Sequence, residues 1–126
     1  MSHLLLVCAG GAIGAGCRYL LNTAAVRLLM LDVAWATLTV NILGSCAMGA
    51  IIAYISHKFP QDTLLKAFIT TGMLGGFTTF SAFSLDTLRL LERGDFGLAL
   101  LYVSSSVVLS ITACAVAYFG IRTLIA

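Results

Sequence analysis

The stretch TTGMLGGFTTFSAFSLD, from Thr70 to Asp86, decides how the rest of this chain is interpreted. It lies within an apolar run, yet it contains a Gly-Gly pair, two phenylalanines three positions apart and a cluster of Ser and Thr hydroxyls. Backbone that leaves the helix inside a bilayer is tolerated only where protein or a water-filled cavity surrounds it. We therefore expect this segment to line a pathway through a membrane, with the other segments as its frame.

The composition is that of an integral membrane protein. Of the 126 residues, 60% are hydrophobic and 10% are charged, whereas a soluble domain is about 45–50% apolar and about 25% charged. The length suits one compact domain with no soluble module. The net charge of +2 is too small to indicate a nucleic-acid partner. No basic residue precedes the first apolar run, and we expect this run to be retained as a membrane helix.

Four apolar stretches approach the roughly 20 residues that cross a bilayer. They cover residues 3–21, 34–56, 64–91 and 96–121 of a single domain, residues 1–126. The third is long, and Gly75 and Gly76 lower its helix preference midway. The sequence therefore predicts an all-α membrane protein with four transmembrane helices, the third broken in mid-membrane.

The basic residues divide almost evenly between the two sides that four crossings define. The terminal side carries Lys58, Lys66 and Arg122, and the other side carries Arg18, Arg27, Arg89 and Arg93. Orientation is fixed by an excess of Lys and Arg on one side. The counts leave two possibilities open: insertion in both orientations, or one orientation that wins by a small margin. Mixed insertion favours an antiparallel two-fold dimer with the pore between subunits.

Polar residues on the first two helices have two interpretations each. Asn41 shares a helix face with Thr37 and Ser45, and a buried amide needs hydrogen-bond partners. It either joins helices or donates an N–H to an anion, and the spacing does not decide between these roles. Arg18 near a membrane end either extends its charge to the interface or draws anions into a vestibule. Gly10 and Gly14 form a face for close helix contact.

The third segment offers groups for two kinds of ion. A break at the glycine pair frees carbonyl oxygens, which suit a hard cation. Phe80 and Phe83 share a face on the resumed helix, and their positive ring edges can approach an anion, although lipid or core contact is the alternative. Asp86, the only acid inside a span, is either functional or paired with Arg89.

The fourth helix carries a stripe of weakly polar groups, each four positions apart: Tyr102, Ser106, Ser110 and Cys114. We interpret it as a polar track. The four cysteines lie in apolar runs without a C-x-x-C pair, which predicts packing rather than redox or metal chemistry. Amides, hydroxyls and ring edges favour an anion pathway. No nucleophile–base pair, metal cluster or phosphate loop is visible, and we do not expect an enzyme.

Three motifs, in order, resemble the Fluc/CrcB family of bacterial fluoride channels. GGAIGAGCRY (Gly10–Tyr19), TLTVNILGSCAMG (Thr37–Gly49) and TTGMLGGFTTFSAFS (Thr70–Ser84) match the family's successive G-G-x-x-G-A-x-x-R-Y, T-L-x-V-N-x-x-G-S and T-G-x-x-G-G-x-T-T-F-S-T-F-S patterns. The resemblance covers all four helices. It implies passive fluoride export through two pores of an antiparallel, dual-topology homodimer in the bacterial inner membrane. It also implies a structural Na⁺ at the dimer centre and a role in fluoride resistance.

The resemblance also implies roles for individual residues. The carbonyls of Gly75 and Thr78 would hold the Na⁺, and Arg18 would lie at the vestibule. The fluoride pore would be formed by Asn41, Phe80, Phe83, Ser81, Tyr102, Ser106 and Ser110.

The chain departs from the family pattern at three positions. Ala82 stands where Thr is common, Asp86 replaces the usual Glu, and Cys114 occupies a track position that is often polar. Two other classes remain as alternatives. A small dual-topology drug–proton antiporter relies on a Glu in its first helix, which this chain lacks. A membrane scaffold subunit accounts for Asn41 and the glycines but not for the interrupted third segment.

Overall fold

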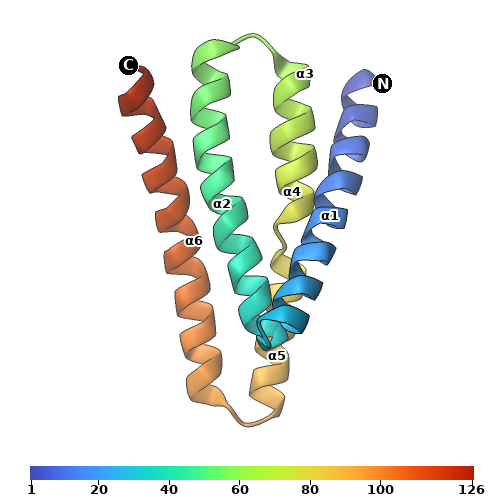
Figure 1. The fold of residues 1–126 in the computed structure, drawn as a ribbon, viewed down its shortest axis with the longest axis vertical. Helices are drawn as coiled ribbons and strands as arrows, with labels where there is room; N and C mark the ends of the chain where they lie inside the picture. Colours follow the sequence, from blue (N-terminus) through green and yellow to red (C-terminus); the bar gives the residue numbers. More distant parts are fainter.

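The computed structural model describes residues 1–126, which fold into helices alone. Three long helices are α1 (Ser2–Leu28), α2 (Val33–Lys58) and α6 (Phe96–Ile125). Between α2 and α6 the chain forms α3 (Thr63–Lys66), the π-helix η1 (Ala67–Leu74), α4 (Gly75–Phe77) and α5 (Phe80–Glu92). Both termini lie at one end of the molecule with the α2–α3 loop, and the α5–α6 turn lies at the other end (Figure 1).

Three helices, α1, α2 and α6, are long and apolar enough to cross a membrane. The fourth expected crossing consists of the shorter segments α3 to α5. Helix α1 continues past its expected end at Leu21 to Leu28, through polar residues such as Asn22. Helical hydrogen bonding does not stop where apolar composition stops, and this is why the apolar run underestimates the helix.

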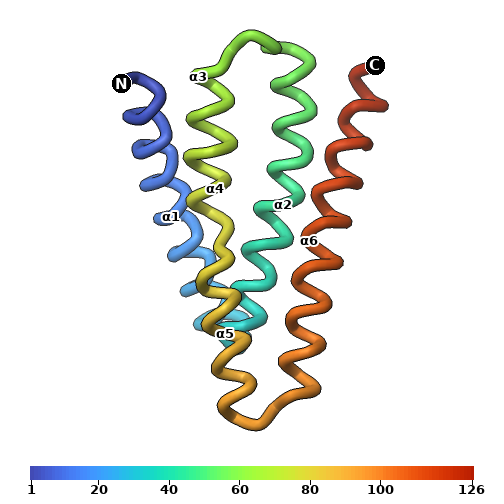
Figure 2. The backbone as a smooth tube through the Cα atoms, turned by 180° about the vertical axis from the view of Figure 1, so that it is seen from behind, coloured from blue at the N-terminus to red at the C-terminus, as the bar shows by residue number.

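Glycines bring α1 against η1 and α4, which lie beside it in both ribbon and tube views (Figures 1 and 2). A Cβ on Gly10 would collide with the Phe68 carbonyl, and one on Gly14 with the Met73 carbonyl. On the facing segment, a Cβ on Gly76 would lie 2.6 Å from the Gly11 oxygen. The predicted small-residue face of the first helix is therefore confirmed as a packing surface, of the kind that lets membrane helices approach closely.

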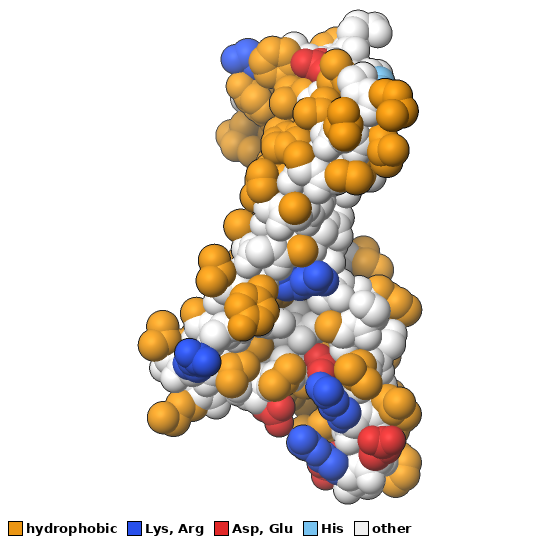
Figure 3. All heavy atoms as spheres, turned by 90° about the vertical axis from the view of Figure 1, so that its right-hand side faces the viewer, with side chains coloured by type: hydrophobic (Ala, Val, Ile, Leu, Met, Phe, Trp, Pro, Cys, Tyr) orange, Lys and Arg blue, Asp and Glu red, His pale blue; other side chains and the backbone are white.

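The hydrophobic core lies toward the end that carries the α5–α6 turn. Its buried members come from α2, α5 and α6: Ala34, Leu38, Leu90, Ala99 and Tyr102. On the face drawn in Figure 3, basic atoms appear near the middle, and most charged side chains gather toward the same end as this core. The cysteines do not serve this core, because Cys8, Cys17 and Cys46 are exposed in the single chain and Cys114 is half-buried.

The third segment loses helical geometry at two residues. Thr78 has φ −76° and ψ 158°, and Thr79 has φ −151° and ψ 121°, both extended. Gly75, at φ −63° and ψ −38°, remains helical. The glycine pair was expected to be the site of interruption, whereas the structure has extended residues just after α4. The reason is that Gly76 provides close contact with α1, and the unpaired backbone groups at Thr79 find a partner in α2.

Candidate functional site

Asn41 of α2 holds the extended residue Thr79 by a reciprocal pair of hydrogen bonds. Its Nδ2 donates to the Thr79 carbonyl at 2.9 Å, and the Thr79 N–H donates to its Oδ1 at 2.8 Å. The side-chain amide thus satisfies both backbone groups that the interrupted helix leaves open. One N–H of the Asn41 amide remains for another acceptor. The two roles left open by the sequence, joining segments and donating to an anion, are compatible in this geometry.

Thr79 also begins α5. Its hydroxyl accepts from the Ala82 N–H at 3.1 Å, as an N-cap residue does. The Ser81 hydroxyl lies 3.3 Å from the Thr79 hydroxyl. From the sequence, Thr79 was expected only to add a hydroxyl to the third segment, and not to begin a helix. The signal was present, since a Thr placed before an amphipathic run is typical of a helix start.

A groove of about 360 Å³ lies between α2, the interruption, α5 and α6. Five residues expected to form the pore line it together: Asn41, Phe80, Phe83, Ser106 and Ser110. The remaining lining residues are Ser45, Met48, Thr78, Thr79, Val107, Ile111 and Cys114. Of the expected pore set, Ser81 and Tyr102 are not in this lining. The Cys114 position does lie on the groove, at the end of the expected polar stripe.

Two hydroxyls in the groove have no partner. The side-chain oxygens of Ser106 and Ser110 are buried and make no hydrogen bond. Their neighbour Ser105 differs, because its hydroxyl donates to the Leu101 carbonyl at 2.6 Å. Buried polar atoms are nearly always paired with protein or water. The unpaired hydroxyls therefore mark the groove as a place for water or for an acceptor such as an anion.

Aromatic rings continue from the groove toward the core. The ring centroids of Phe80 and Phe83 are 5.4 Å apart, and those of Phe83 and Tyr102 are also 5.4 Å apart. Phe80 is 78% exposed in the single chain, whereas Tyr102 is fully buried and its hydroxyl has no partner. Tyr102 thus lies behind Phe83 as part of the buried core, against which Phe83 packs.

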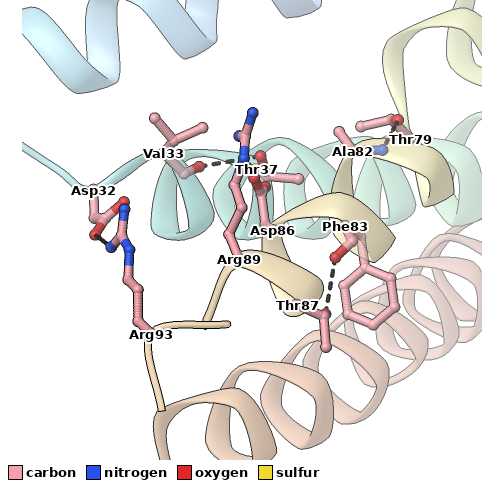
Figure 4. Close-up of polar contacts among 10 residues, drawn as sticks. All are labelled: Asp32, Val33, Thr37, Thr79, Ala82, Phe83, Asp86, Thr87, Arg89 and Arg93. Carbon is pink, nitrogen blue, oxygen red and sulfur yellow. Dashed lines mark hydrogen bonds and ion pairs between the residues drawn. The ribbon is translucent and has the colours of Figure 1, made fainter. Parts of the chain in front are cut away.

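Beyond Tyr102, the buried carboxylate of Asp86 is only 4% exposed. Its Oδ1 faces the Arg89 guanidinium at 3.4 Å, and its Oδ2 has no hydrogen-bond partner. A second ion pair joins Arg93 to Asp32 at 3.7 Å (Figure 4). Pairing of Asp86 with Arg89 was one of two interpretations of the sequence, and the structure contains it. The free Oδ2 leaves half of the carboxylate available.

Two carbonyls near the interruption lose their helical donors. The Thr79 N–H, which would bond to Gly75 in a continuous helix, is taken by Asn41. The Ala82 N–H, which would bond to Thr78, is taken by the Thr79 hydroxyl. The Arg18 guanidinium lies 3.4 Å from the Thr78 carbonyl instead. Arg18, which was expected at a vestibule, thus contacts the Thr78 carbonyl, one of the expected cation ligands.

Comparison with known proteins identifies the family. The model of the family "CrcB-like protein, Camphor Resistance (CrcB)" matches residues 5–120. A fluoride-specific ion channel FluC of Chelativorans sp. is 50% identical over 125 residues, covering 99% of this chain and all of the relative. Proteins of the same name from Rhodospirillum centenum and Agrobacterium fabrum are 44% and 43% identical over 126 and 113 residues, covering 100% and 90% of both chains. With its apolar helices, this chain is a multi-pass membrane protein of the CrcB family of ion channels, and not an enzyme.

Proposed function

We propose that this protein is a fluoride-selective channel that exports F⁻ passively down its electrochemical gradient. The observation that carries the proposal is the groove in which Asn41, Phe80, Phe83, Ser106 and Ser110 meet. Relatives named fluoride-specific ion channels share up to half of their residues with the chain over nearly its full length. The groove supplies neutral donors to the ion: an amide N–H, two unpaired hydroxyls and aromatic ring edges.

Neutral donors suit the physical problem of conducting fluoride. Fluoride is small and strongly hydrated, and a conducting site must replace its water without trapping it. A buried Arg in the groove would hold the ion too tightly to release it. Ring edges carry only partial positive charge, and the hydroxyls of Ser106 and Ser110 are already unpaired. No coupled ion is needed for such a pathway.

The pore is completed by a second copy of the chain in an antiparallel arrangement, giving two pores per dual-topology homodimer. Two features support this assembly. The groove is open along one side, and Phe80 at its rim is largely exposed. The order of the segments in the sequence assigns three basic residues to one side of the membrane and four to the other. Such a division gives no strong preference for one orientation in the membrane.

A structural Na⁺ at the dimer centre would be held by the carbonyls of Gly75 and Thr78. These residues fit the ion because both oxygens lack their helical N–H donors, and hard cations prefer oxygen ligands. Two carbonyls per chain give four in a two-fold dimer. Arg18 lies 3.4 Å from the Thr78 oxygen, and its guanidinium competes for the same acceptor. The ion would fix the interruption at the dimer centre. We place the protein in the bacterial cytoplasmic membrane, where this activity would confer fluoride resistance.

The test is fluoride efflux from liposomes that contain the purified protein. The liposomes are loaded with K⁺ and F⁻, valinomycin is added to allow charge balance, and an electrode follows external fluoride. Passive conduction predicts rapid efflux without an imposed proton or Na⁺ gradient. Efflux that requires either gradient would contradict the proposal. A growth test adds a second arm: cells lacking the gene should become sensitive to fluoride and not to cationic dyes.

A further inference from the structure

A second cavity shares no lining residue with the groove. It lies where α2 and α6 end, and these helix ends lie at the end of the molecule that carries both termini (Figure 1). It has a volume of about 300 Å³ and lies between the last turns of α2 and α6. Its lining residues are Ala53, Ser56, His57, Tyr118, Arg122, Ile125 and Ala126. Arg and His side chains line it, and no Asp or Glu side chain does. The cavity is therefore suited to an anionic ligand.

The Arg122 guanidinium in this cavity makes no ion pair with an Asp or Glu side chain. The two ion pairs of the structure join Arg89 to Asp86 and Arg93 to Asp32, at the opposite end. The guanidinium carbon of Arg122 instead lies 5.7 Å from the ring centroid of Tyr118. Stacking on an aromatic face orients a guanidinium and leaves its N–H edge free to donate.

Cationic side chains at helix C-termini often interact with the last carbonyls of the helix. In α2, the Ile55 carbonyl accepts the Phe59 N–H at 2.8 Å. In α6, the Arg122 carbonyl accepts the Ala126 N–H at 3.0 Å. No carbonyl at these ends accepts a bond from the side chain of His57 or Arg122. Their donors remain available for a ligand in the cavity.

We propose that this cavity binds the phosphate of an anionic phospholipid headgroup. The Arg122 guanidinium matches phosphate oxygens with two parallel N–H donors, and His57 and Ser56 add further donors from α2. The cavity lies where two membrane-crossing helices end, at the depth of the lipid headgroups. Phe119 follows the lining residue Tyr118 in α6 and is exposed, so it gives an acyl chain an apolar surface that inorganic phosphate would not use.

Lipid binding is tested with the purified channel in detergent. Thermal unfolding is followed with added phosphatidylglycerol, with phosphatidylcholine and with inorganic phosphate, and bound lipids are counted by native mass spectrometry. We expect phosphatidylglycerol alone to raise the melting temperature clearly. In Arg122→Gln its binding should weaken about tenfold or more, because charge-assisted hydrogen bonds are lost. Lys66→Gln is the matched control, since Lys66 lies at the same end but bonds to the Pro60 carbonyl.

Three results would overturn the proposal. Equal stabilisation by phosphatidylcholine would reduce the effect to acyl contact, and equal stabilisation by phosphate would assign a free-anion site. Binding of phosphatidylglycerol that is unchanged in Arg122→Gln would exclude the cavity. Arg122→Lys and His57→Gln serve if Arg122→Gln does not fold, and both should bind the lipid more weakly than the Lys66→Gln control. Fluoride efflux by the same variants reports separately on the channel, because the cavity does not touch the groove.

Discussion

Asn41 and Thr79 hold each other through two hydrogen bonds of 2.9 and 2.8 Å, although 38 positions separate them in the chain. The amide of Asn41 binds both the N–H and the carbonyl of Thr79. This pair fixes the extended residues between α4 and α5 against α2. It also places the remaining N–H of Asn41 beside the groove, so that one side chain links the geometry of the interruption to the proposed path of the ion.

Replacing Asn41 with Leu should destabilise the fold and abolish transport. The Thr79 N–H and carbonyl would both lose their partner, at a cost of about 1–3 kcal/mol for each unsatisfied group. Asn41→Asp keeps an acceptor for the Thr79 N–H but puts a negative charge in the groove. We expect fluoride flux to be lost, while the melting temperature falls less than it does in Asn41→Leu. Thermal unfolding and liposome efflux measure the two effects. Thr39→Val is the control, because that hydroxyl bonds only to the Trp35 carbonyl of its own helix. Normal flux in Asn41→Asp would refute a donor role for the amide.

Phe83→Ile should reduce fluoride flux strongly while the dimer still assembles. Isoleucine keeps an apolar side chain between the groove and Tyr102 but removes the polarised ring edge. Phe119→Ile is the matched control, since Phe119 is exposed on α6 and lines neither cavity. Efflux is measured in liposomes and assembly by size-exclusion chromatography. Wild-type flux in a well-folded Phe83→Ile protein would show that the ring is only a packing element.

Ser106→Ala should separate transport from stability. The Ser106 hydroxyl is buried without a partner, and removing it therefore relieves an unsatisfied group rather than breaking a bond. We expect an unchanged or slightly higher melting temperature together with slower efflux. In Ser105→Ala, where the hydroxyl bonds to its own helix, efflux should be unaffected. Equal efflux in wild type, Ser105→Ala and Ser106→Ala would exclude the serine stripe as a track.

Gly14→Ala should lower stability, because the added Cβ meets the Met73 carbonyl. Backbone atoms cannot move aside as a flexible side chain can, and overpacking of this kind costs about 1–3 kcal/mol. Gly16→Ala on the same helix meets no atom within 4 Å and should be neutral or stabilising by up to ~1 kcal/mol. Thermal unfolding of the two variants in the same detergent makes the comparison. A melting temperature for Gly14→Ala equal to that of Gly16→Ala would mean that α1 does not pack on η1 as described.

Exchanging Na⁺ for a large organic cation during purification should weaken the dimer and slow efflux if the Gly75 and Thr78 carbonyls hold the ion. Repulsion between the freed carbonyl oxygens would then be uncompensated. Arg18→Gln removes the competing guanidinium, which lies 3.4 Å from the Thr78 oxygen. The variant should need less Na⁺ for half-maximal stability than wild type. Dimer dissociation measured across a Na⁺ titration tests both statements, and a dimer indifferent to Na⁺ in both proteins would argue against the site.

The amino-acid composition was enough to identify a membrane protein, and the motifs pointed to the stretch from Thr70 to Asp86. Segments that cross the hydrocarbon core of a bilayer must be apolar along their whole length, and the composition therefore reveals them. The glycine face of α1 could also be predicted from the sequence, because Gly10 and Gly14 lie about one turn apart on any helix. The family motifs then selected candidate residues such as Asn41 and Phe83 without any coordinates.

Which of those candidate residues lie together depends on how the helices pack in three dimensions. It placed Ser106 in the groove with Asn41, left Ser81 and Tyr102 outside its lining, and moved the interruption from the glycine pair to Thr78 and Thr79. The helix preferences of individual residues do not predict where the helix is interrupted or which side chains line the groove. The third segment leaves helical geometry where Asn41 of α2 binds the backbone N–H and carbonyl of Thr79. These two residues are far apart in the sequence.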